Sequence, residues 1–143
     1  MRGFVSDIAG MILAALVACT TGPEPPTDVV AGTWGGENAG LIATDSTVHV
    51  HIGCTLGDVS GPLHLDAEGN FEATGLYNVD VYPVDRGILH PARYTGRVTG
   101  RTMMLTVALT DTTRQLGPVL LTYGKEPRMQ ACPICRLPAS QHR

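Results

Sequence analysis

The chain has 143 residues, 16% of them charged, and a formal net charge of −3. Nucleic-acid-binding domains usually carry a basic stripe for the phosphates, so this charge balance argues against a nucleic-acid partner. The length is enough for one domain with a single core, and the 17 glycines suit many tight turns.

The first predicted element is a lipoprotein signal peptide over residues 1–18. Arg2 gives a positive start, and residues 8–18 form an apolar run of 11 residues. A membrane-spanning helix needs about 20 such residues, so this run is too short for a lasting anchor. The sequence LVAC at residues 16–19 resembles a bacterial lipobox, in which cleavage exposes a lipidated cysteine, here Cys19. An ordinary secretory signal and a short transmembrane helix are the alternatives.

Lipidation of Cys19 predicts a protein of the cell envelope whose membrane contact is its N-terminal lipid. Thr20 follows this cysteine and favours an outer membrane in a host that has one, with the domain in the periplasm or at the cell surface. Residues 19–28 contain three prolines and predict a semi-extended tether. We expect a β-domain over residues 29–132 and a C-terminal tail over 133–143.

The domain is predicted to be all-β, because short alternating runs are separated by Gly- and Asp-rich turns. No segment after the leader shows a helical period, and residues 79–92, with two prolines, are predicted to form a long loop. About eight strands favour a small antiparallel meander barrel, with a β-sandwich as the alternative. The predicted strands are 30–35, 40–44, 47–54, 62–66, 70–77, 93–98, 101–110 and 116–123.

Two sets of motifs resemble known proteins. GTW at residues 32–34 and DAEGNF at residues 66–71 resemble the opening strand and a hairpin of lipocalin- and avidin-like (calycin) barrels. In those barrels the tryptophan, here Trp34, closes one end. This resemblance implies the architecture more than any ligand.

The second set resembles a family of small uncharacterised bacterial exported proteins and lipoproteins. The resemblance spans roughly residues 31–132, and His49 and His51 depart from it because acidic residues are more usual there. It implies an exported β-domain and brings no activity with it. The motifs, in chain order, are TWGGE at 33–37, Cys54, ARYTGRV at 92–98, MLTV at 104–107, LTDT at 109–112 and Cys132.

Cys54 and Cys132 are predicted to form a disulfide, since export places them in an oxidising compartment. Closing a loop of about 79 residues would stabilise the fold by roughly 4 kcal/mol on the chain-entropy estimate. Cys135 would then be free, and two unpaired buried thiols are the alternative. Cys132 and Cys135 also form a Cys-x-x-Cys pair, but neither a helix nor a clear set of further ligands accompanies it, so redox and zinc roles are secondary hypotheses.

The histidines suggest a speculative metal site. If residues 47–54 pair with residues 62–66, His51 faces His64 and His49 faces Asp66 on one polar surface. Three imidazoles and a carboxylate could hold zinc. Outward strand positions are normally polar without any ligand, so no metal or other cofactor is predicted.

We expect a non-enzymatic binding module, because no acid–base pair, nucleophile elbow or nucleotide loop stands out. Its ligand would be a small apolar molecule or a partner protein. The alternative is a packed structural or interaction protein, such as an inhibitor of an exported enzyme, that binds through residues 79–92. A metal-dependent enzyme on the histidine face is the third possibility. Residues predicted to line the barrel interior are Trp34, Val50, Ile52, Leu65, Phe71, Tyr94, Leu105 and Val107.

Overall fold

A computed structural model describes residues 28–81 and 86–132. The predicted signal peptide, the lipidation at Cys19 and most of the tether lie outside the described residues. The same holds for the tail beyond residue 132, which includes Cys135.

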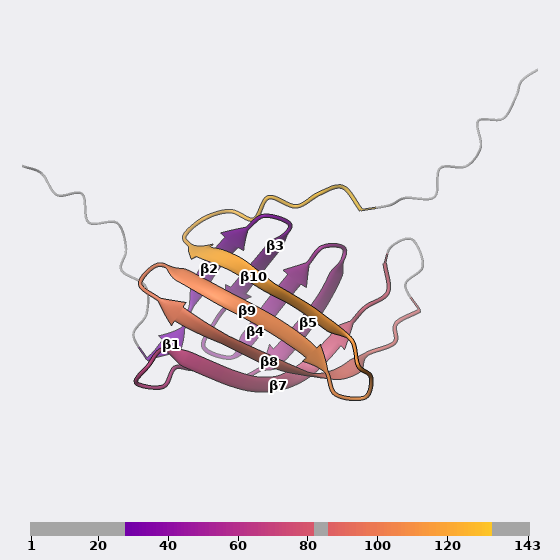
Figure 1. Ribbon diagram of the computed structural model, residues 1–143, viewed down its shortest axis with the longest axis horizontal. Helices are drawn as coiled ribbons and strands as arrows, with labels where there is room; N and C mark the ends of the chain where they lie inside the picture. Colours follow the sequence, from indigo (N-terminus) through magenta and orange to yellow (C-terminus); the bar gives the residue numbers. More distant parts are fainter. Residues whose placement is uncertain (1–27, 82–85, 133–143) are drawn as a thin grey trace, which may run out of the picture.

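Eight antiparallel strands close into a barrel, which confirms the predicted fold class (Figure 1). Each strand pairs with the next barrel strand along the chain, and the last pairs back with the first. The closing contact is short, with Thr122 opposite Gly35 and Tyr123 opposite Trp34. The barrel strands are β2 (Gly32–Gly36), β3 (Ala39–Ala43), β4 (Thr47–Ile52), β5 (Thr55–Ser60), β7 (Asn70–Asn78), β8 (His90–Thr99), β9 (Thr102–Leu109) and β10 (Gln115–Tyr123).

Two short strands lie outside the barrel and correct the sequence prediction. β1 (Val29–Val30) pairs with β6 (Leu63–His64) in a separate two-stranded sheet. The segment 62–66 therefore does not pair with β4, as predicted. β4 pairs instead with β5, a strand that was not predicted.

β5 was not predicted because most of its inward residues are not strongly apolar. Thr55, Gly57 and Val59 point inward and are buried, and only the last is strongly apolar. A side chain at Gly57 would overlap the rings of Tyr77 and Tyr94, so glycine here makes room for two aromatic residues.

Side chains fill the barrel interior. Trp34, Tyr77 and Tyr94 are fully buried among the alternating apolar residues of all eight strands. The polar atoms of these rings have partners. The Trp34 Nε1–H donates to the Ala31 carbonyl at 3.0 Å, and the Tyr94 hydroxyl donates to the Leu76 carbonyl at 2.7 Å. A small barrel holds either side chains or a ligand, and this one holds side chains.

The chain after β10 crosses the outside of the barrel, and we call residues 124–132 the C-terminal strap (Figure 1). Its end is fixed by the Cys54–Cys132 disulfide, which confirms the predicted pairing. The position of Cys54 differs from expectation: it lies in the turn between β4 and β5, not on the apolar face of a strand. The strap therefore tethers the end of the domain to the middle of the meander.

Candidate functional site

A cleft of about 160 Å³ opens on the outer wall of the barrel, between strands β2–β4 and the C-terminal strap. Its lining is apolar except for two imidazoles and one hydroxyl. The residues that line the cleft are far apart in the sequence. The lining residues are Thr33, Gly40, Leu41, Ile42, His49, His51, Pro127 and Met129.

The cleft exists because two glycines let the strap approach the barrel wall. Gly35 and Gly40 face each other across β2 and β3. A Cβ on Gly40 would lie 2.8 Å from Cβ of Pro127, and a Cβ on Gly35 would overlap the backbone of the strap. Any larger residue at either position would therefore push the strap outward.

Backbone hydrogen bonds hold the strap in register over the β2–β3 turn. The Asn38 N–H donates to the Arg128 carbonyl at 2.9 Å, and the Arg128 N–H donates to the Gly36 carbonyl at 3.0 Å. Asn38 itself has φ 54°, in the left-handed region that asparagine tolerates better than most residues. These bonds fix the position of Pro127 and Met129 beside the histidines.

His49 and His51 form the imidazole wall of the cleft. They project outward from β4, and their ring centroids lie 4.7 Å apart at an interplanar angle of 68°. Asp58, opposite His49 on β5, places its Oδ1 2.6 Å from His49 Nδ1. The carboxylate therefore fixes the orientation of the His49 ring.

His51, like His49, is partly buried. Partial burial and the neighbouring His49 lower the pKa of His51, and Asp58 acts in the opposite direction. A lowered pKa keeps this imidazole neutral at neutral pH, so its nitrogen lone pair is available to a ligand. Within the described part of the chain, no residue hydrogen-bonds to the His51 ring.

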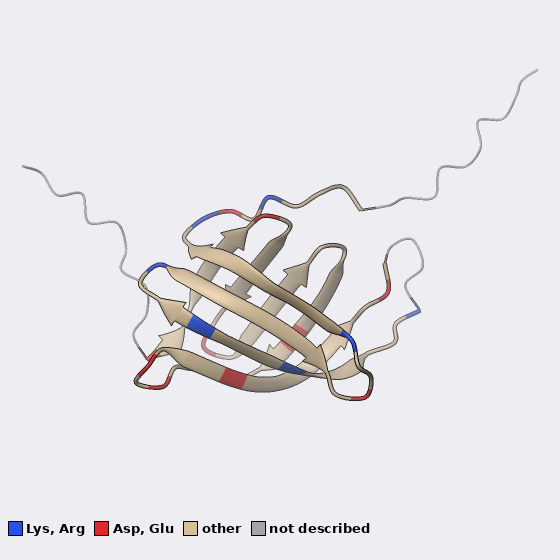
Figure 2. Cartoon of the chain, in the orientation of Figure 1, with Lys and Arg blue, Asp and Glu red and all other residues tan. Residues whose placement is uncertain are grey.

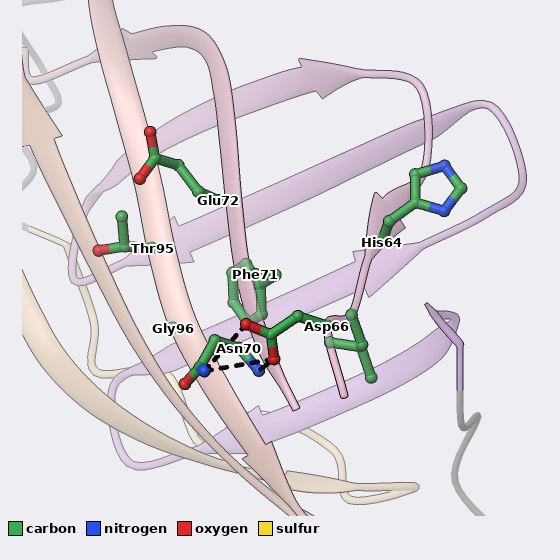
Figure 3. Close-up of a pocket in the computed structure, with 8 residues that line it drawn as sticks. His64, Asp66, Asn70, Phe71, Glu72, Thr95 and Gly96 are labelled. Atoms are coloured by element: carbon green, nitrogen blue, oxygen red, sulfur yellow. Dashed lines mark hydrogen bonds between the residues drawn. The ribbon is translucent and has the colours of Figure 1, made fainter. Parts of the chain in front are cut away.

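The other two members of the predicted metal set lie elsewhere. His64 is on β6, opposite Val29, and Asp66 belongs to the turn that leads into β7. Figure 3 shows the His64 ring pointing away from the Asp66 carboxylate. The predicted facing of His49 with Asp66 and of His51 with His64 is wrong, because β5 occupies the place beside β4. In the residues that the structure describes, no three His, Cys, Asp or Glu side chains gather as a metal site.

A larger and more open groove of about 640 Å³ lies beside β6, the start of β7 and the second half of β8 (Figure 3). Its main polar groups already serve a turn. The Asp66 carboxylate accepts hydrogen bonds from the Asn70 backbone N–H at 2.7 Å and from its Nδ2 at 3.0 Å. These bonds lower the pKa of Asp66. The groove therefore offers fewer free polar groups to a ligand than the cleft does.

The residues predicted to line an internal ligand site belong to the packed core. Trp34, Val50, Phe71, Tyr94 and Leu105 are between 0 and 4% exposed, and Ile52 is partly buried against them. Phe71 also borders the open groove. The inward positions predicted on the barrel strands are correct, whereas Leu65 lies outside these strands and borders the open groove. The sequence gave no measure of how completely the inward side chains fill the space.

The segment predicted as a contact loop carries exposed apolar side chains. Val81, Ile88 and Leu89 are 42%, 43% and 55% exposed, and residues 82–85 lie outside the described residues. Charged side chains lie mainly in the turns and on β5, β7 and β8 (Figure 2). Much of the remaining outer wall, including the cleft, is without formal charge.

No family model, curated protein or solved structure matches the chain. Across residues 28–81 and 86–132, no helix has the length and hydropathy needed to cross a membrane. Because no known protein matches, what the cleft can bind is inferred from the residues that line it.

Proposed function

We propose that this protein is a non-enzymatic binding module of the cell envelope that takes its ligand in the outer cleft. A lipid on Cys19 would anchor it to the membrane, as the lipobox-like sequence at residues 16–19 indicates. The resemblance to exported bacterial lipoproteins supports the same location. The ligand is small, and no nucleic acid is involved.

One observation carries the proposal: side chains fill the interior, whereas the outer wall is hollowed under the strap. The cleft measures about 160 Å³. An apolar cavity of about 150 Å³ is large enough for a benzene-sized molecule. A ligand would meet Ile42 and Met129 as apolar surfaces and His49 and His51 as polar groups. This combination of an apolar wall with few polar groups is typical of small-molecule sites.

The test narrows the cleft with Ile42→Trp and measures the native mass of the mature protein, extracted gently from its own membrane. We expect the wild-type protein to carry an excess mass that is lost on denaturation. In Ile42→Trp the larger side chain occupies ligand space, so the excess should fall by at least about tenfold in abundance, or about 1.4 kcal/mol in binding free energy.

Leu120→Trp is the matched control, because Leu120 is 57% exposed, close to the 53% of Ile42, and does not border the cleft. This variant should keep the excess mass. If the wild type carries no excess, or if Ile42→Trp keeps it in full, the outer cleft is not the binding site.

The exposed apolar residues of segment 79–92 favour a second candidate function, a packed interaction protein that binds another envelope protein. Double substitution of Ile88 and Leu89 by Ser would then abolish a stable complex detected by cross-linking in the intact envelope. The same variant would leave any ligand mass in the cleft unchanged. The two functions are thus separable by variant.

A further inference from the structure

We propose that the cleft binds monovalent copper through the imidazoles of His49 and His51 and the thioether of Met129. The inference rests on the proposed function, because it names the ligand of the same cleft. All three side chains border one cleft, although Met129 is 78 residues from His51 in the sequence.

The two imidazoles are spaced for one ion. Metal–imidazole bonds are about 2.0 Å long, so two rings on one ion have centres about 5 Å apart. His49 and His51 have centroids 4.7 Å apart. They are at alternate positions of β4, which points both side chains to the same face of the sheet. The strand thus supplies the pair without any distortion of the backbone.

Asp58 fixes the orientation and the tautomer of the His49 ring that coordination requires. An ionised carboxylate only accepts hydrogen bonds, so the Nδ1 that lies 2.6 Å from Asp58 Oδ1 carries the imidazole proton. The lone pair is then on Nε2, the nitrogen farther from Asp58. Metal-ligating histidines commonly donate their other N–H to a carboxylate in this way, which fixes the tautomer and raises the basicity of the ligand.

The third donor selects the metal. Met129 is 41% exposed and lines the same cleft as the two imidazoles. Thioether ligands favour Cu(I), whereas Mg²⁺ and Ca²⁺ prefer oxygen ligands. Three neutral donors in an apolar cleft also suit a single positive charge, because desolvation costs rise with charge.

The experiment titrates the purified mature lipoprotein with Cu(I) under anaerobic conditions against a coloured Cu(I) chelator, with Zn²⁺ titrated separately. We expect one Cu(I) per chain. His49→Asn and His51→Asn should each remove most of the binding. Met129→Leu should weaken Cu(I) at least about tenfold while Zn²⁺ binding stays unchanged, and Asp58→Ala should weaken Cu(I) about 10- to 100-fold, the usual range for such a partner.

Matched controls are His64→Asn and Met104→Leu. Met104 is 44% exposed on β9, close to the exposure of Met129, and neither control residue borders the cleft. Both variants should bind Cu(I) as the wild type does. Far-UV circular dichroism of every variant separates a lost site from a lost fold.

Three results would overturn the copper site: no Cu(I) bound by the wild type, no effect of Met129→Leu, or the same loss in the control variants. The proposed function fails in a different way. An organic ligand mass that disappears in Ile42→Trp, in a protein that does not bind Cu(I), would remove copper and keep the cleft as the binding site. A ligand mass that persists in full in Ile42→Trp would remove the cleft as well.

Discussion

Trp34→Ala should cost about 3–5 kcal/mol of the free energy of unfolding, the range for a large aromatic residue removed from a core. Trp34 is fully buried and packs edge-to-face on Tyr123, with ring centroids 5.1 Å apart. Its removal leaves a cavity and also removes the indole hydrogen bond to the Ala31 carbonyl. Small domains have about 5–15 kcal/mol in total, so most of the stability would be lost.

Urea unfolding followed by circular dichroism measures this loss, because the variant has no other tryptophan for fluorescence. Leu120→Ala serves as the control, since exposed substitutions usually change stability by less than about 0.5 kcal/mol. The loss of stability in Trp34→Phe should lie between those of Trp34→Ala and Leu120→Ala. A loss below about 1.5 kcal/mol in Trp34→Ala would mean that the interior is loosely filled, against the packing described above.

Removal of the disulfide by Cys54→Ser with Cys132→Ser should cost about 4 kcal/mol. The bond joins residues 78 apart in the sequence, and closing so long a loop restricts the unfolded chain strongly. The bond also fixes the end of the C-terminal strap, which carries Pro127 and Met129. We therefore expect the same double variant to weaken binding in the cleft.

Urea unfolding without reductant compares this double variant with Cys135→Ser. The pairing of Cys54 with Cys132 predicts that Cys135→Ser leaves stability unchanged. A large loss in Cys135→Ser, or none in the double variant, would contradict the pairing. Added reductant should lower the stability of the wild type and leave that of the double variant as it is.

The strand pattern could be predicted because alternation is a local property of the sequence. Met103, Leu105 and Val107 occupy alternate positions of β9, and the structure buries all three inside the barrel. The disulfide could also be predicted, because only three cysteines follow the predicted lipidation site at Cys19 and they offer few pairings. Both rest on residue type and order alone.

The histidine register could not be predicted because it depends on which strand lies next to β4. Residues 55–60 are not among the predicted strands, whereas in the structure they form β5 and place Asp58 opposite His49. The residue opposite His49 is also an aspartate, Asp58, but it belongs to β5, which the sequence did not predict. The inward Gly57 of β5 is explained by the bulk of Tyr77 and Tyr94, which are far from it in the sequence.

The cleft could not be predicted because one of its walls is the C-terminal strap, which follows the last predicted strand, 116–123. A signal for it was present: Gly35 and Gly40 occupy outward strand positions, where glycine often marks the close approach of another backbone. What approaches is the strap, and its path is set by the disulfide at Cys132. The sequence could suggest a contact there but not its partner.

The most direct test of the outer-cleft account compares methyl NMR spectra of the protein as isolated with spectra after its ligand is removed. The account predicts shifts at the methyl groups of Ile42 and Met129, which border the cleft. The methyl groups of Val50 and Leu105, buried inside the barrel, should not move. Shifts confined to these interior methyl groups would contradict the account and place the ligand inside the barrel.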